Sequence, residues 1–133
     1  TGSNTVCINK EKVNTSILPD TWLTLEREWK EGDEITISFE FVLRFESVDS
    51  YAPEVAALVY GPIVLACDKM TLFDGDRATP EEWIKPIQKD GYSFAFRTKP
   101  GHVRPYEHLT REFYPYYEIP QMQWYYMYSR FTK

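Results

Sequence analysis

Two glutamates in the first third of the chain have the residue type and spacing that glycoside hydrolysis uses. Glu26 and Glu28 share one face of a predicted strand, which places their carboxyl groups about 7 Å apart. Cleavage of a glycosidic bond needs two carboxyl groups roughly 5 to 9.5 Å apart, one of them kept protonated by burial. This pair instead flanks Arg27 in the arm of a predicted hairpin, and carboxylates in that position usually form a solvated face. We therefore expect no catalytic role for them.

Two further groups of side chains could bind a metal ion. The acidic sequence Asp74-Gly75-Asp76 offers oxygen ligands for Ca²⁺, but it lacks the rest of a calcium loop, so a plain turn is the favoured interpretation. Structural zinc needs three or four closely spaced ligands, whereas His102 and His108 lie far from both cysteines. Cys7 and Cys67 have apolar neighbours, where a free cysteine packs as a small hydrophobic side chain. The sequence predicts no metal, no cofactor and no catalytic residue in this chain.

Aromatic side chains are the remaining candidates for function, because exposed Trp and Tyr rings can stack on sugars while their polar groups bind hydroxyls. They form 17% of the chain, and nine of them lie within residues 113–131. Tyr125 and Tyr126 are adjacent, so on a strand they cannot face the same side. We name Trp124, Tyr126 and Tyr117 as candidate stacking residues for a plant-type glycan. The competing interpretation is that these rings fill the core.

Composition excludes several classes of protein. With 15 Lys and Arg against 20 Asp and Glu, the net charge is −5 and no basic stripe is present, so we expect no nucleic-acid partner. Apolar runs such as Ile63–Cys67 are far shorter than the ~20 residues that span a bilayer, so we expect no membrane partner. The aromatic content excludes disorder. A chain of 133 residues can bury a substantial core, and we predict one domain over residues 1–133.

Apolar residues alternate along much of the chain, which predicts an all-β fold, an antiparallel and jelly-roll-like β-sandwich. The clearest stretch is Glu34–Glu46, one face of which is apolar and should lie in the core. Because it is longer than an average strand, we expect a bend near Phe41 that carries the chain from one sheet to another. Residues 54–60 and 63–67 are apolar on both faces, as central strands are.

Two hairpins and one helix accompany these strands. Residues 22–28 should pair with the long stretch just described through the turn Lys30–Asp33, in which Gly32 supplies the positive φ of a tight reversal. A shorter hairpin turns at Asn9, which tolerates the left-handed region. The only helical pattern is Thr79–Trp83, which begins with a capping box and lies in a loop-rich insertion between strands.

Several segments, in their order and spacing, resemble one known family. They are Cys7–Val13, Trp22–Ile35, Val59–Ala66, Phe113–Ile119 and Trp124–Tyr128. Together they resemble the C-terminal β-sandwich domain of glycoside hydrolase family 127, bacterial β-L-arabinofuranosidase-like enzymes long classed as a domain of unknown function. Lys10 stands where the family's opening hairpin usually has Gly, and residues 70–105 match no motif of the family.

The resemblance implies that the chain is one part of a larger glycoside hydrolase. In that family the active site lies in an N-terminal (α/α)₆ barrel, with a Cys nucleophile, a Glu, and zinc held by Cys and Glu ligands. Neither Cys7 nor Cys67 falls in a matching motif, so no catalytic residue is assigned by resemblance.

We therefore predict a non-catalytic accessory domain that packs against the barrel of the same polypeptide or mediates a homodimer. Such a domain should expose an apolar patch of several hundred Å² where the barrel docks. The alternatives are a carbohydrate-binding module that uses exposed Trp and Tyr rings, and a self-contained enzyme.

Overall fold

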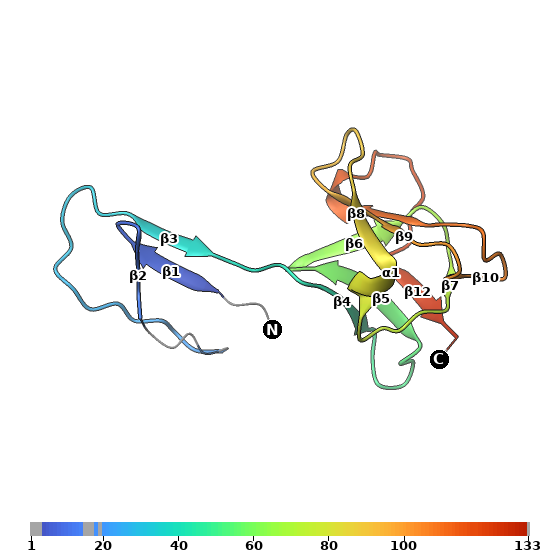
Figure 1. Ribbon diagram of the computed structural model, residues 1–133, viewed down its shortest axis with the longest axis horizontal. Coiled ribbons are helices and arrows are strands. Elements are labelled where there is room, and N and C mark those ends of the chain that lie inside the picture. Colours follow the sequence, from blue (N-terminus) through green and yellow to red (C-terminus); the bar gives the residue numbers. More distant parts are fainter. Residues whose placement is uncertain (1–3, 15–17, 19, 133) are drawn as a thin grey trace. The chain divides into compact units, whose positions relative to one another are not determined.

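The structure is a computed structural model that describes residues 4–14, 18 and 20–132 (Figure 1). The contacts divide the chain into two compact units, one that ends at Phe41 and one that begins at Val42. We call them unit 1 and unit 2 and describe each by itself. The expectation of one domain within a larger enzyme stays a prediction. No helix among the described residues is long and apolar enough to cross a membrane.

Unit 1 is a three-stranded antiparallel sheet with the strand order β2-β1-β3. Its strands are β1 (Thr5–Ile8), β2 (Glu11–Lys12) and β3 (Ile35–Ser38). The short hairpin expected at Asn9 is confirmed, with φ of 51° at Asn9 and 71° at Lys10. Two successive residues with positive φ make the kind of tight turn whose twist matches that of the flanking strands.

The hairpin predicted between residues 22–28 and the following strand is wrong, because β3 pairs with β1 instead. Residues 22–28 form no strand, although the turn at Lys30–Asp33 is present, with the Asp33 amide donating to the Lys30 carbonyl. The side chain of Asn9 explains the pairing. It donates to Asp33 Oδ1 at 2.7 Å and accepts from the Glu34 amide at 2.9 Å, which fixes the start of β3 beside the end of β1.

Unit 2 is built on a sheet that divides at its central strand, β5 (Val55–Tyr60). One edge of β5 pairs with β4 (Leu43–Ser47). The other edge pairs first with β12 (Tyr128–Phe131) and then with β6 (Ile63–Cys67). Two arms continue from there, in the orders β12-β7-β10 and β6-β11-β9-β8. The remaining elements are β7 (Leu72–Phe73), α1 (Pro80–Trp83), β8 (Ile84–Ile87), β9 (Ala95–Thr98), β10 (Val103–Arg104), β11 (Glu112–Pro115) and the 3₁₀ helix η1 (Tyr116–Glu118).

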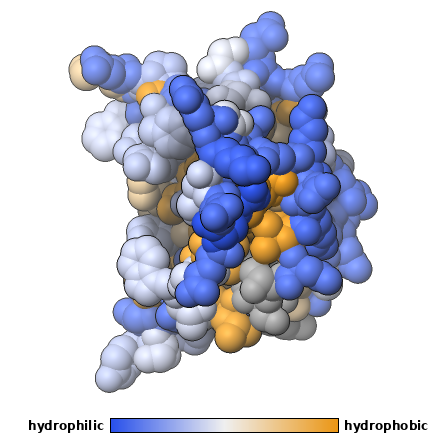
Figure 2. Space-filling view, turned by 90° about the vertical axis from the view of Figure 1, so that its left-hand side faces the viewer, coloured by the Kyte–Doolittle hydropathy of each residue, from blue (hydrophilic) through white to orange (hydrophobic). Residues whose placement is uncertain are grey.

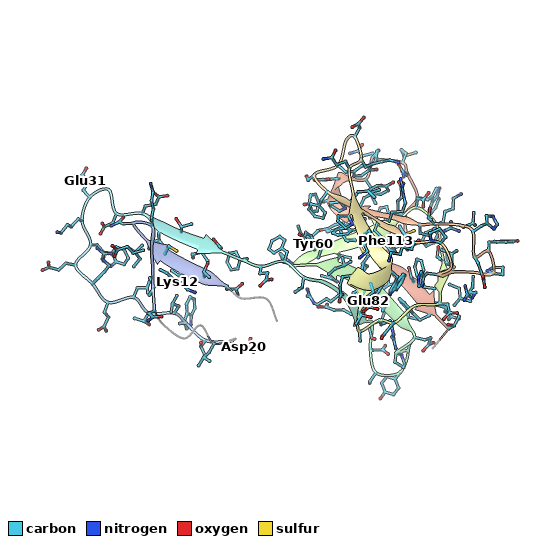
Figure 3. The ribbon with its side chains drawn as sticks, viewed as in Figure 1. Lys12, Asp20, Glu31, Tyr60, Glu82 and Phe113 are labelled. Carbon is cyan, nitrogen blue, oxygen red and sulfur yellow. The ribbon has the colours of Figure 1, made fainter. Side chains whose placement is uncertain are left out.

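The core of unit 2 lies between these two arms. Phe73 of β7 is 5.8 Å from Phe113 of β11 between ring centroids, and Phe131 of β12 is 5.9 Å from Phe73. Figure 3 shows Phe113 among the crowded side chains of this interior. The all-β prediction is confirmed, and the two arms form a layout consistent with a β-sandwich. One pairing departs from the antiparallel expectation, because β12 runs parallel to β7.

The expected change of sheet near Phe41 is confirmed, because the long alternating stretch splits into β3 and β4, which belong to different sheets. Its apolar face was expected in the core, and this is correct only for β4, where Leu43 and Phe45 pack against the core of unit 2. On β3, Ile35 and Ile37 are 47% and 53% exposed. The reason is that unit 1 contains a single sheet, with no second layer among its described residues.

The predicted helix forms as α1, with Pro80 at its first position. The predicted capping box is wrong, because the Thr79 side chain makes no capping hydrogen bond and the Thr79 carbonyl instead accepts from the Glu82 amide at 3.1 Å. The helix ends where β8 begins. Pro86 lies in β8, an edge strand of the sheet, where a missing N–H breaks no ladder on the open side.

Candidate functional site

One face of the unit 1 sheet carries apolar side chains that its own residues cover only in part. The register places Val6 opposite Ile37 and Ile8 opposite Ile35, so these four side chains share a face, which we call the apolar face. Val6 and Ile8 are buried, whereas Ile35 and Ile37 on β3 are about half exposed. Phe39, two residues beyond Ile37, is 65% exposed. Figure 2 shows hydrophobic side chains at the surface, between hydrophilic ones.

The strand that carries this exposed half is also an edge strand. β3 pairs with β1 on one side and has no other partner in the described sheet. An edge strand with an exposed apolar face is a template for association with another surface. Trp22 and Trp29 of unit 1 are exposed as well, Trp22 almost completely, and the Arg27 guanidinium lies 5.1 Å from the centroid of Trp29.

The three candidate stacking residues lie in different settings within unit 2. Trp124 is 85% exposed and lines a hollow of about 260 Å³ together with Met122. Tyr117 in η1 is exposed and meets Tyr116 edge to face at 5.6 Å. Tyr126 is half-buried, and its backbone forms a bridge to Cys67. No ring contact joins any two of the three in the described part of the chain, so their use as one platform stays a prediction.

The paired glutamates near the start of the chain lack the setting that catalysis requires. Glu26 and Glu28 lie in a loop rather than on a strand, so the argument that set their spacing does not apply. Both are exposed, whereas the general acid of a glycoside hydrolase is buried. The interpretation of the pair as a solvated surface agrees with this placement.

The cysteines are both free, and they differ in burial. Cys67 is fully buried in the core of unit 2, as a small hydrophobic side chain should be, while Cys7 in unit 1 is half-buried. Burial raises the pKa of the Cys67 thiol to about 11. The thiol therefore stays protonated near neutral pH and is a poor nucleophile.

The structure reveals one charged cluster that the sequence reasoning missed, centred on Glu112 of β11. Lys89 Nζ lies 2.8 Å from Glu112 Oε2, Arg97 Nε lies 3.0 Å from Glu112 Oε1, and the Tyr114 hydroxyl donates to Oε2. Partial burial acts to raise the pKa of Glu112, but the hydrogen bonds from Lys89, Tyr114 and Arg97 outweigh it and lower the pKa to about 2. Burial and the bond to Glu112 raise the pKa of Tyr114.

The contacts of this cluster hold neighbouring segments of unit 2 together. Both carboxylate oxygens of Glu112 already accept hydrogen bonds, and no second carboxylate joins the cluster among the described contacts. The ion pairs tie β11 to β9 through Arg97, and to the segment before β9 through Lys89. No signal in the sequence pointed to it, because Lys89 lies 23 residues from Glu112 along the chain.

The histidines and the acidic loop are likewise engaged in structural contacts. His102 stacks on Trp83 at 5.0 Å, and its Nδ1 lies 2.8 Å from the Asp74 carbonyl. His108 meets Tyr106 edge to face at 6.2 Å, in a different setting. The described residues contain no group of three or more His, Cys, Asp or Glu side chains that could hold a metal ion.

Comparison with solved structures places this fold in a class. The chain aligns over 98% of its length with a protein described as a GH127 β-arabinofuranosidase, with a TM-score of 0.66 and 16% sequence identity. The chain therefore has a GH127-like fold. It spans 23% of that enzyme's chain, so the alignment concerns a small part of it. A scan against protein-family models gives no match, and a search of curated proteins gives none either.

Proposed function

We propose that this chain is a non-catalytic accessory domain of a β-L-arabinofuranosidase-like glycoside hydrolase, and that its apolar face packs against the helical catalytic barrel of the same polypeptide. The exposed apolar face of unit 1 carries this proposal. The GH127-like fold supports it, because the aligned region makes up less than a quarter of the similar enzyme.

The energetics of the apolar face favour a covering partner. Ile35, Ile37 and Phe39 each keep about half or more of their surface exposed. Full burial of such a side chain is worth roughly 1.5–3 kcal/mol, so covering the exposed parts gains about 1 kcal/mol for each residue. A small sheet with one uncovered hydrophobic face is only marginally stable in water. Docking would therefore stabilise unit 1 as well as join the two domains.

The chemistry of the described residues supports a role outside catalysis. The one carboxylate with a strongly shifted pKa, Glu112, is held ionised by three donors. The buried thiol of Cys67 is held protonated. Neither group has the free, poised state that a nucleophile or a general acid needs.

The test starts from the gene. The coding sequence on both sides of the 133 residues is read, and the whole encoded polypeptide is purified beside the 133-residue chain. We expect a large helical domain, hydrolysis of an aryl β-L-arabinofuranoside by the whole polypeptide, and no hydrolysis by the chain alone. A gene that encodes no further domain, or turnover by the chain alone, contradicts the proposal.

Hydrogen exchange then tests the docking face. In the whole polypeptide, the amides of Ile35 and Ile37 should exchange at least tenfold more slowly than in the 133-residue chain. Ile37→Asp should abolish this protection, whereas Thr36→Asp, a matched change on the opposite face of β3, should preserve it. If the protection depends on protein concentration, a second copy of the chain covers the apolar face, and the proposal that the barrel covers it is contradicted.

A carbohydrate-binding module is the second candidate function, favoured by the 85% exposure of Trp124. Calorimetric titration with arabinan and arabino-oligosaccharides should then release heat that Trp124→Ala abolishes. Trp22→Ala, a similarly exposed Trp in unit 1, is the control and should leave the heat unchanged. Absence of heat with every glycan would remove this candidate.

A further inference from the structure

A cleft of about 600 Å³ opens on unit 2, and none of the candidate stacking residues lines it. Its walls are Phe45 and Ser47 of β4, the loop 74–78 between β7 and α1, and Thr132 just after β12. This volume falls within the range of about 300–1,000 Å³ that is usual for small-molecule sites. All of these residues belong to unit 2.

The loop that forms one wall is held in place from both of its sides. Gly75 packs so closely on Trp83 that a Cβ there would lie 2.6 Å from Trp83 Cε2, so only glycine fits. The Trp83 indole N–H donates to the Asp76 carbonyl at 2.8 Å. On the other side, Arg104 Nη2 lies 2.5 Å from Asp74 Oδ2. A wall fixed in this way loses little conformational freedom when a ligand binds.

The cleft presents hydrogen-bonding groups of both kinds. Asp76 Oδ1 accepts from the Ala78 amide at 2.8 Å, and its Oδ2 has no partner in the described part of the chain, so it is available as an acceptor. Arg77 Nη1 donates to the Pro53 carbonyl, and its guanidinium lies 5.3 Å from the centroid of Phe131, which holds this cationic donor group at the wall. The hydroxyl groups of Ser47 and Thr132 already donate to the Pro53 carbonyl and to Asp74 Oδ1, so towards a ligand both can act as acceptors.

An aromatic ring supplies the apolar part of the lining. Phe45 stacks on Trp83 with the ring centroids 5.8 Å apart and the planes inclined by 15°, and its edge meets Phe131 at 4.7 Å. These contacts hold Phe45 firmly in the core while part of its surface lines the cleft. A ring held in this manner can pack against the C–H face of a ligand.

The charges around the cleft favour a neutral ligand. Asp74 is paired with Arg104, and Asp76 stands beside Arg77, so acidic and basic groups balance. A lone cation would be opposed by the two guanidinium groups, and an anion by the two carboxylates. A purely apolar ligand would leave Asp76 Oδ2 without a partner, which is unfavourable. A molecule with several hydroxyl groups and an apolar C–H face satisfies every part of the lining.

We propose that this cleft is a binding site for a neutral saccharide unit. The sugar hydroxyls donate to Asp76 and Asp74 and accept from Arg77, while the C–H face of the ring packs on Phe45. The site is distinct from the surface around Trp124 and does not depend on docking to a barrel.

The test is an amide NMR titration of the complete 133-residue chain with L-arabinose, D-galactose and D-glucose in turn. At least one sugar should shift the amides of Gly75, Asp76 and Thr132 in a saturable manner. Asp76→Ala should raise the Kd at least tenfold. Asp76→Asn keeps an acceptor for the Ala78 amide, so the loop should retain its conformation. A raised Kd in this variant as well would show that the effect does not come from a rearranged loop. Asp90→Asn, a matched change outside the cleft, should leave the Kd within twofold.

Three outcomes would overturn the proposal. The first is the absence of any shift up to the solubility limit of each sugar. The second is a set of sugar-induced shifts confined to residues around Trp124, which would assign binding to the stacking surface. The third is an equal shift of the loop amides by CaCl₂ or by inorganic phosphate without sugar, which would identify an ion site.

Discussion

Replacing Glu112 by Gln removes the negative charge that Lys89, Arg97 and Tyr114 share. Gln has nearly the same shape and can still accept hydrogen bonds, so the change isolates the contribution of the charge. We expect unit 2 to lose stability at pH 7 and to retain its fold.

The expected magnitude follows from the pKa of this carboxyl group. A fall from an ordinary 4.5 to about 2 corresponds to at most roughly 3–4 kcal/mol of stabilisation by the ionised form. Lys89 and Arg97 have side chains that are 44% and 47% exposed, so solvent screens part of this attraction. We therefore expect Glu112→Gln to lower the free energy of unfolding by about 1–2 kcal/mol at pH 7.

The dependence on pH distinguishes charge from packing. Because the pKa of Glu112 is lower in the folded chain than in the unfolded chain, the carboxylate stabilises the fold above about pH 4.5, and this contribution is lost as the pH falls to about 2. Urea unfolding followed by tryptophan fluorescence, to which the buried Trp83 contributes, measures the difference between the two proteins at each pH. Glu82→Gln, a change at an exposed residue of α1, serves as the matched control and should have little effect.

Two results would refute this reasoning. If the difference between the proteins at pH 2 to 3 equals that at pH 7, the loss reflects packing rather than charge. If Glu112→Gln has no effect at pH 7, the cluster does not stabilise unit 2. Addition of about 1 M salt should also reduce the difference, because salt screens partly exposed ion pairs.

Three further predictions concern the core of unit 2. Gly75→Ala should destabilise it by about 1–3 kcal/mol, because the new methyl group would overlap the Trp83 ring; an unchanged urea midpoint would contradict this close packing. Native Cys67 should react with iodoacetamide at pH 8 far more slowly than Cys7, because Cys67 is fully buried and burial raises its pKa to about 11; peptide mass spectrometry measures both rates, and equal rates would show that Cys67 is accessible. Leu65→Ala should cost about 2–5 kcal/mol by urea unfolding, because Leu65 is fully buried, and a loss below about 1 kcal/mol would mean that the core relaxes around the missing atoms.

Sequence patterns anticipated the strands whose signals are local. The segments that became β5 and β6 are apolar on both faces, and central strands need this whatever their partners. The turn between them follows from Gly61, which has φ of 57°, and Pro62. The break between β3 and β4 near Phe41 could be predicted because the alternating stretch is longer than a strand usually runs.

The pairing of the strands and the exposure of their side chains could not be predicted from local sequence patterns. Residues 22–28 have the pattern of a strand, yet β3 pairs with β1. The Asn9 side chain stabilises this pairing by binding the Glu34 amide, 25 residues away along the chain. Alternation shows that Ile35 and Ile37 share a face, but it does not show whether the chain has a second layer to cover that face.

The sequence by itself determined the all-β class, the central strands of unit 2, the short helix and the absence of basic clustering, because each depends on residues that are close together in the chain. The tertiary structure alone decided that Asp74 meets Arg104 and Thr132, which lie 30 and 58 residues away, and that a cleft forms beside them. It also decided that Ile35 and Ile37, on the apolar face of unit 1, stay about half exposed. Contacts of this kind depend on which distant strands pair, and no local pattern of side chains specifies that choice.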